Sequence, residues 1–522
     1  MSRCLYRVTS QKQCTRKCYK HEVHCWQHLK KKSSEGFKNL SLKSVKIKSI
    51  FQPSQLVFIG FGSVAKAVLT LMSKLEKKLL NRPILIVEPK DISDSEIIKS
   101  LYQFQPLKQN KNVHKDGHAT WLKIAINENN YRQIFSNFIN DDAIIIELAY
   151  RLDTCCLLIE CNKKNCLYIN TSLDDWVVNN DTLFEIKRKL TQKIKKHEMT
   201  AVLNHGMNPG IVSHLSKYLL SQLSTQWGDT FAESMCSKGN YNLAAQKLGL
   251  TLIQIAERDT QKSIINTDET FYTNTWSVIG YIDEAIDYVQ LGWGTHEDYF
   301  PNGADDSTLQ ESGQIVLSVL GGQTRTLCYE PMGGTYTGYC IPHAESYSLT
   351  NYLTIEDQYR PTIYYSYLVP DVAKLMTHYM EYSLDKNQLP EKEHVLRSDE
   401  ILQGADSVGC LMYFRRPEGI RTYWIGSILD NNFALSISPE INATGIQVAI
   451  SVLSAINWML ANPHAGIIEP EMLDTEFILA YCLPWLGNVF YADVTEQYQP
   501  TGDRFIDHIV APSGLLFDSN DY

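Results

Sequence analysis

A glycine-rich turn between a short apolar run and a helical pattern constrains the fold most strongly. Residues 56–59 read LVFI, and Gly60, Gly62 and Ala65 follow in the spacing G-x-G-x-x-A before helical periodicity over residues 64–80. In such a turn the glycines let the backbone approach a pyrophosphate, while the helix N-terminus supplies amide donors and a positive dipole end. The pattern predicts a strand, a turn and a helix that together bind a dinucleotide.

The strand that follows, residues 84–87, ends at Glu88. A carboxylate there accepts hydrogen bonds from ribose hydroxyls and repels a 2′-phosphate, so the sequence favours NAD over NADP. Strand-like runs at 143–148 and 166–170, with helices between them, continue a doubly wound parallel sheet. We therefore predict an α/β fold with a Rossmann domain over 53–203. Its cofactor-binding residues are assigned as Gly60, Gly62, Ser63, Val64, Glu88, Asn170 and Thr171.

The pattern changes after residue 203. Strand-like runs at 252–256, 315–320, 407–414 and 422–428 alternate with helices, which predicts an α+β substrate and catalytic domain over 204–440. We expect 441–522 to be a C-terminal helical region that packs back on the Rossmann domain. Its long apolar helix, 446–461, contains several polar residues and is short for a bilayer span, so we predict a buried helix and no membrane segment.

Charge is distributed unevenly along the chain. The net charge is −9, but residues 1–50 carry +11 and the remainder carries −20. An acidic body attracts cations and repels nucleic acid, so a cationic substrate suits it. Nucleic acid is a candidate partner only for residues 1–50.

Cysteines and histidines crowd the first 30 residues. The chain has 13 cysteines and no recognisable secretory leader, which indicates reduced thiols and a cytoplasmic location. Cys4, Cys14, Cys25 and His28 have a spacing able to close a tetrahedral zinc site, with Cys18 as a substitute ligand. We predict a small basic zinc-binding module over 1–30 and a linker over 31–52. The alternative is a disordered basic leader with accidental cysteines.

Several polar runs lie beyond the Rossmann domain in a recognisable order. They are NHGMNPG (204–210), AERDTQ (256–261), NTWS (274–277), GWGTHE (292–297), HAES (343–346) and NATGIQVA (442–449). In this order they resemble the bacterial-type homospermidine synthases, and the resemblance spans about residues 52–490. It implies a saccharopine-dehydrogenase-like fold, usually a homodimer. The implied enzyme uses NAD to join two putrescines, or putrescine and spermidine, into homospermidine with release of ammonia or diaminopropane.

The expected chemistry can be argued from the residues themselves. Removing hydride from an amine-bearing carbon needs a proton acceptor and a polar site that stabilises the resulting iminium. The indole face of Trp276 suits the cation, since a cation–π contact contributes about 0.5 to 2 kcal/mol. The alternative is a core tryptophan beneath a helix start.

Carboxylates and a histidine complete the predicted site. We assign Glu257 and Glu284 to amine binding and proton transfer, although on spacing alone either could be a surface acid. His343 and Glu345 are two residues apart, so in a strand both would face one pocket. Glu345 is assigned to the far amino group and His343 to proton transfer or orientation. A metal site built from His343 and His296 is the alternative.

The resemblance adds Asn208 and Asp174 to the substrate site. Asn208 precedes a proline and could instead merely shape the turn. Asp174 stands where the family commonly has glutamate, so it keeps the charge but reaches one methylene less. Substrate preference therefore stays open at this position.

Two other functions remain. A saccharopine or carboxynorspermidine dehydrogenase shares the fold but needs Arg or Lys for an α-carboxylate, and Arg258 and Arg325 are the nearby candidates. A catalytically dead NAD-binding scaffold would bind NAD without turning over any amine.

Overall fold

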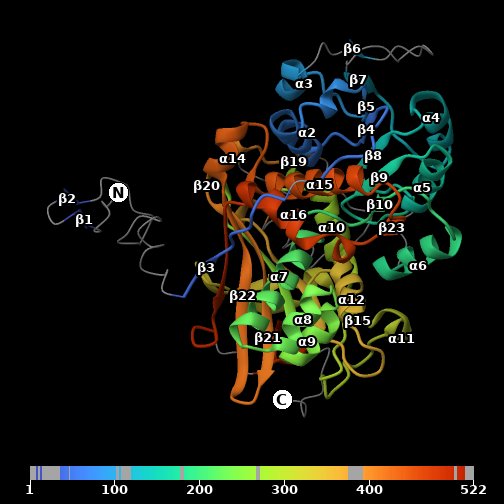
Figure 1. Ribbon diagram of the computed structural model, residues 1–522. Coiled ribbons are helices and arrows are strands. Elements are labelled where there is room, and N and C mark those ends of the chain that lie inside the picture. Colours follow the sequence, from blue (N-terminus) through green and yellow to red (C-terminus); the bar gives the residue numbers. More distant parts are fainter. Residues whose placement is uncertain are drawn as a thin grey trace.

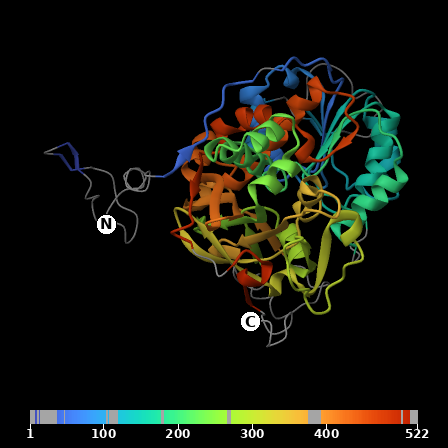
Figure 2. The same cartoon turned by 60° about the horizontal axis from the view of Figure 1, so that its bottom comes forward.

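The computed structural model describes residues 7–9, 12–13, 36–45, 47–101, 105–106, 119–176, 181–265, 271–373, 392–498 and 502–511. Its architecture has two main sheets, which Figure 1 and Figure 2 show as a blue and teal layer beside a green, yellow and orange one. Short pairs of strands lie outside both sheets. They are β1 (Arg7–Thr9) with β2 (Lys12–Gln13), β12 (Lys262–Ser263) with β20 (Ile401–Gln403), and β13 (Phe271–Asn274) with β19 (Lys392–Val395).

The first main sheet is eight-stranded and parallel, and its order reverses between β4 and β8. Its central strands are wholly buried and, apart from Phe58 and Glu147, consist of Ile, Leu and Val, which is typical of a sheet covered on both faces. Across the sheet the strands are β23 (Ile467–Ile468), β10 (Ala201–Val202), β9 (Leu167–Asn170), β8 (Ile144–Glu147), β4 (Leu56–Ile59), β5 (Ile84–Val87), β7 (Ala119–Leu122) and β6 (Gln105–Pro106). The doubly wound parallel sheet predicted from the sequence is thereby confirmed.

Helices connect these strands. They are α2 (Ser63–Leu75), α3 (Glu96–Leu101), α4 (Tyr131–Phe138), α5 (Thr154–Lys163) and α6 (Leu183–Lys193). The predicted helix over 64–80 is too long, because α2 ends at Leu75 and a separate 3₁₀ turn follows at Leu79–Asn81. Asp153 and Thr182 cap α5 and α6 by accepting backbone N–H bonds, which fixes where each helix begins.

The second main sheet is eleven-stranded and mostly antiparallel. Its strands are β25 (Ile509–Ala511), β16 (Arg325–Glu330), β17 (Gly334–Tyr339), β18 (Thr362–Leu368), β11 (Leu250–Asp259), β21 (Ala405–Arg416), β22 (Gly419–Asp430), β24 (Asn488–Asp493) and β3 (Lys38–Asn39), with β14 (Tyr288–Gly292) and β15 (Gln314–Leu320) beside β18. Its helices are α7 (Ile211–Gln226), α8 (Thr230–Ser237), α9 (Tyr241–Leu248), α10 (Val278–Ile286), α11 (Leu309–Ser312), α12 (Ser348–Leu353) and α14 (Asn431–Ile437).

The C-terminal part of the chain joins both sheets. Helix α15 (Ala443–Ala461) packs against α2 of the parallel layer and against α16 (Thr475–Cys482), and it lies in the middle of the molecule (Figure 1). Strand β23 extends the parallel sheet, whereas β24 and β25 belong to the other sheet. By length and composition α15 could cross a membrane, but 83% of its most apolar stretch is buried inside the protein. It is a core helix, as the sequence predicted.

Candidate active site

The glycine-rich turn forms an open cradle at the reversal point of the parallel sheet. Gly60 has φ +85°, and a Cβ added there would lie 2.9 Å from the Leu148 carbonyl oxygen of the β8 end, so only glycine fits. A Cβ added at Gly62 meets no described atom within 4 Å. Ser63 and Val64 open α2, whose N-terminus has no side-chain cap. Its first amides are therefore available to an anion above Gly62.

Glu88 faces this cradle from the end of β5. It is buried, and its Oε2 accepts the Phe61 backbone N–H at 2.8 Å while Oε1 accepts that of Lys90 at 2.8 Å. The carboxylate is thereby held beside the turn, where an adenosine ribose lies in such folds. These residues fit a dinucleotide with free ribose hydroxyls.

Asn170 and Thr171, the other predicted cofactor residues, lie at the end of β9. The Asn170 Oδ1 accepts the Asn204 N–H at 3.0 Å, and its carbonyl oxygen accepts that of His205. Asn170 therefore holds the NHGMNPG turn against the parallel sheet, and Thr171 lies next to Gly206 in that turn.

Trp276 stands at the start of α10 in a group of aromatic rings. Its Nε1 donates to the Tyr367 hydroxyl at 3.1 Å, and its ring makes edge contacts with Tyr281 and Tyr367. Ser277 caps α10 by accepting the Gly280 N–H, which fixes the backbone at Trp276. The indole is half-buried, so one part of it stays open to a ligand.

Glu257 is a buried carboxylate held by two side-chain donors. Its Oε2 accepts hydrogen bonds from Asn208 Nδ2 at 3.1 Å and from the Tyr365 hydroxyl at 2.9 Å, while Oε1 has no partner among the described residues. Burial and the negative charge of Asp259 raise the pKa of Glu257 to about 7, against the effect of its donors. Near neutral pH Glu257 therefore exists in both protonation states.

His343 lies between two carboxylates and above a tyrosine. Its Nε2 is 3.7 Å from Glu284 Oε1, its Nδ1 is 3.5 Å from Glu345 Oε2, and its ring stacks on Tyr365. Burial lowers the pKa of His343, but the two carboxylates outweigh it and raise that pKa to about 10. Burial also raises the pKa of Glu284. His343 is thus an imidazolium at neutral pH.

The conformation predicted for His343 and Glu345 is wrong, although their proximity is right. They do not lie in a strand, because the chain turns into the 3₁₀ helix Ala344–Ser346 immediately after an extended His343. The turn brings the Glu345 carboxylate back towards the imidazole.

Sequence reasoning missed a second layer of carboxyl groups behind Glu257. Asp259 on β11 is directly opposite Asp406 on β21, and both are buried. The Asp259 carboxylate accepts the Thr275 hydroxyl at 2.5 Å, and Asp406 accepts that of Thr444 at 2.6 Å. Burial is the main cause that raises the pKa of each. Nothing along the chain marks Asp406, because only the register of β11 against β21 brings it here.

Asp174 lies at the joint between the parallel layer and α10. Its carboxylate accepts the Arg151 backbone N–H in a short contact, and the Arg151 side chain donates to Asp283 Oδ1 at 3.0 Å. Burial raises the pKa of Asp174 to about 6. Asp283 immediately precedes Glu284, so Asp174 is close to the part of α10 that carries Glu284. Arg151 and its neighbour Tyr150 were not anticipated from the sequence.

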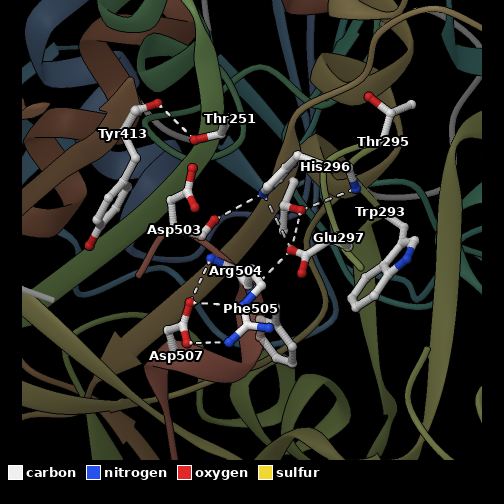
Figure 3. A network of polar contacts seen from close by, with 12 residues as sticks. Thr251, Trp293, Thr295, His296, Glu297, Tyr413, Asp503, Arg504, Phe505 and Asp507 are labelled. Atoms are coloured by element: carbon white, nitrogen blue, oxygen red, sulfur yellow. Dashed lines mark hydrogen bonds and ion pairs between the residues drawn. The ribbon is translucent and has the colours of Figure 1, made fainter. Parts of the chain in front are cut away.

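The GWGTHE run lies outside this constellation. Figure 3 shows His296 and Glu297 facing the segment that carries Asp503 and Phe505. His296 Nε2 donates to the Asp503 carbonyl oxygen at 2.9 Å, and Glu297 Oε1 accepts the Thr362 hydroxyl at 2.6 Å and the Phe505 N–H at 3.0 Å. The run therefore anchors the C-terminal segment.

Neither metal prediction gains support. Among the described residues no group of three or more His, Cys, Asp or Glu side chains is placed to hold a metal ion. Cys4, Cys14, Cys25 and His28 lie outside the described residues. Arg258, the candidate for an α-carboxylate, is paired with Glu330 at 3.3 Å.

Comparisons with known proteins agree with this geometry. Residues 56–202 match the saccharopine dehydrogenase NADP binding domain and residues 206–489 match the saccharopine dehydrogenase C-terminal domain. The chain is 30% identical over 462 residues to a homospermidine synthase of Mesorhizobium japonicum, covering 84% of this chain and 90% of the relative. It is 29% identical to that of Blastochloris viridis, covering 84% and 91%.

A solved structure gives the same result. The homospermidine synthase of Legionella pneumophila in complex with NAD superposes with a TM-score of 0.76 at 27% identity, covering 89% of this chain and 99% of that one. The glycine cradle, the carboxylates around His343 and these matches lead to one conclusion. The chain belongs to the homospermidine synthase family, built on the paired saccharopine dehydrogenase NADP-binding and C-terminal domains.

Proposed function

We propose that the protein joins two putrescines into homospermidine with release of ammonia, using NAD, and accepts spermidine in place of one putrescine. The observation that carries this proposal is the excess of carboxylates around His343. Glu257, Glu284 and Glu345 surround one imidazolium, whereas the guanidinium of Arg258 is engaged by Glu330. Such a pocket suits a dication and disfavours a substrate carboxylate.

Glu257 is the proposed proton acceptor. Oxidation of the amine-bearing carbon requires the amine to be neutral, so an ammonium group must first lose a proton. With its pKa near 7, Glu257 can take that proton at neutral pH, and Oε1, which has no partner among the described residues, is the acceptor atom. Asn208 and Tyr365 hold the other oxygen and fix the orientation of the carboxylate.

Trp276 and His343 have the complementary roles. The indole face stabilises the iminium by about 0.5 to 2 kcal/mol. The imidazolium of His343 can give a proton to the amine that leaves, because its pKa of about 10 lies in the range of a protonated amine. Glu345 and Asp174 are the proposed partners of the distal ammonium groups. Gly60, Gly62 and Glu88 would hold NAD, which would supply the acceptor for a hydride from the first diamine and the source of that hydride after the second amine has replaced ammonia.

The atoms and electrons balance without net redox. The first diamine loses hydride, the second amine adds to the iminium carbon, and the bond to the original nitrogen breaks as ammonia leaves. The returned hydride then gives a secondary amine. Incubation of the purified protein with putrescine and catalytic NAD should therefore yield homospermidine and ammonia in equal amounts, without accumulation of reduced cofactor. Lack of secondary amine would contradict the proposal.

A dehydrogenase acting on a carboxylated polyamine precursor gives a different result. It reduces or oxidises its substrate stoichiometrically, so reduced cofactor is consumed or accumulates. A scaffold protein binds NAD and forms no product.

Three further features of the proposal concern the whole molecule. We expect a homodimer, as the family resemblance implies, which light scattering tests directly. We expect a cytoplasmic location from the cysteine usage, which fractionation tests. For residues 1–30 we propose zinc binding at Cys4, Cys14, Cys25 and His28, since Cys4 and Cys14 flank the β1–β2 pair in the sequence. Metal analysis of wild type against Cys14→Ser tests it.

A further inference from the structure

The guanidinium of Arg151 lies among acidic residues from two parts of the chain, the parallel-sheet layer and α10. Its backbone N–H donates to the Asp174 carboxylate, and its Nη2 lies 3.0 Å from Asp283 Oδ1 and 3.4 Å from Oδ2. Tyr150, the preceding residue, packs its hydroxyl against Gly280 in the first turn of α10, where an added Cβ would lie 2.4 Å away. The loop after β8 is thereby fastened to the helix that carries Glu284.

The backbone conformation of Arg151 makes this double contact possible. Its φ of +59° is in the left-handed region, which is uncommon for a residue other than glycine. This turn directs the N–H to Asp174 while the side chain reaches Asp283 on another element. The side chains of Arg151 and Asp283 are 36% and 25% exposed, so a solute can reach the pair.

The acidic groups around Arg151 indicate which substrate group its guanidinium keeps away, namely an additional ammonium group. Asp174, Asp283 and Glu284 are the acids that face this joint, and the phenol of Tyr150 lies near all of them. Without the guanidinium they would form an anionic subsite for one more ammonium group. With it, part of their charge is already neutralised, and an additional substrate cation meets a fixed positive charge.

We propose that Arg151 is a specificity-determining residue that acts as a built-in cation and biases the enzyme towards putrescine over spermidine as the aminobutyl donor. This inference rests on the proposed function. Spermidine carries one more positive charge than putrescine. Both donors give homospermidine with putrescine as acceptor, because the aminobutyl carbon loses either ammonia or 1,3-diaminopropane. The coproduct therefore reports which donor was used.

The test is an internal competition. Full-length enzyme with NAD is supplied with equal concentrations of putrescine and spermidine, and the ratio of diaminopropane to ammonia is measured. Arg151→Gln should raise this ratio at least about tenfold, and Arg151→Lys should keep it within about threefold of wild type. Asp283→Asn should lower it, because the guanidinium then loses its counter-charge.

Arg188→Gln is the matched control. Arg188 is 38% exposed and also links the parallel layer to the other sheet's elements, through Glu311 at 3.6 Å. The ratio of diaminopropane to ammonia formed by Arg188→Gln should equal that of wild type. An unchanged ratio in Arg151→Gln, or an Arg151→Lys ratio equal to that of Arg151→Gln, would overturn the proposal. If wild type forms no homospermidine from either donor, the proposed function fails instead.

Discussion

The imidazole of His343 lies face to face with the phenol ring of Tyr365, with ring centroids 3.8 Å apart. The hydroxyl of the same tyrosine donates to Glu257. One aromatic side chain therefore positions both groups proposed for proton transfer.

The hydrogen bond from Tyr365 predicts a shift in pH dependence. This bond stabilises the ionised form of Glu257 and lowers its pKa. If Glu257 accepts the substrate proton, turnover rises with pH as this carboxyl ionises. Tyr365→Phe should therefore move the acidic limb of kcat to higher pH by about one unit. The measurement is kcat at saturating putrescine from about pH 5 to about pH 9, which is about two units on either side of the Glu257 pKa of about 7.

Removing a neighbouring charge should move the same limb in the opposite direction. The negative charge of Asp259 raises the pKa of Glu257, so Asp259→Asn lowers it. The acidic limb should then shift to lower pH, again by about one unit. Titration of the substrate amines is common to both variants and cannot produce opposite shifts. Identical limbs in the two variants would remove Glu257 as the proton acceptor.

Loss of the indole at residue 276 should reduce catalysis without loss of cofactor. A cation–π contribution of about 0.5 to 2 kcal/mol corresponds to as much as about a 30-fold change in rate. Trp276→Ala should lower kcat/KM at least tenfold, about the middle of that range, and leave the Kd for NAD unchanged. Trp276→Phe keeps an aromatic face but loses the bond to Tyr367, so it should be intermediate. Full activity in Trp276→Ala would exclude the assignment.

The two glycines of the cradle predict different defects. Gly62→Ala adds a Cβ into open space, so the free protein should keep its melting temperature while its affinity for NAD falls. Gly60→Ala forces a Cβ to within 2.9 Å of the Leu148 carbonyl oxygen at positive φ. It should destabilise the protein itself by about 1 to 3 kcal/mol. Thermal melts with and without NAD separate the two effects. Equal NAD affinity in Gly62→Ala and wild type would show that NAD does not bind at this turn.

The contacts of the C-terminal segment that carries Asp503 predict a variant with lower stability and unchanged kcat. Asp503 is nearly buried, and Arg415 binds its carboxylate through Nε and Nη2, both at 2.8 Å. Asp503→Ala should lower the unfolding free energy by about 1 to 3 kcal/mol, with kcat intact below the melting transition. Urea titration measures the loss. A loss of kcat at unchanged stability would place this segment in the catalytic machinery.

The sequence predicted what local patterns specify. The strand LVFI and the turn at Gly60 and Gly62 adjoin in the sequence, and Glu88 ends the next strand, which pairs in parallel with LVFI, so the strand–turn–helix–strand pattern predicts their contacts. Asp406 could not be found in this way, because it meets Asp259 only through the pairing of two strands far apart in sequence. The contact between Arg151 and Asp283 could not be found either, because it joins side chains 132 positions apart.

His296 and Glu297 illustrate the converse limit. Their polar types and their position in an ordered series of runs suggested a place near the predicted site, yet their partners are backbone groups of the C-terminal segment and the Thr362 hydroxyl. A buried carboxyl that accepts a backbone N–H and one that binds substrate look alike in a sequence, since both need only an acceptor in an apolar setting.

The decisive measurement follows the hydride through a turnover. Putrescine carrying deuterium at both amine-bearing carbons is incubated with the enzyme, NAD and an excess of unlabelled free NADH, and the mass of the homospermidine is measured by mass spectrometry. If the hydride is borrowed and returned on one bound cofactor, the product retains every deuterium of both substrates and the free NADH stays unlabelled. Loss of one deuterium per product, with label found in free reduced cofactor, would contradict a reaction completed on a single bound NAD.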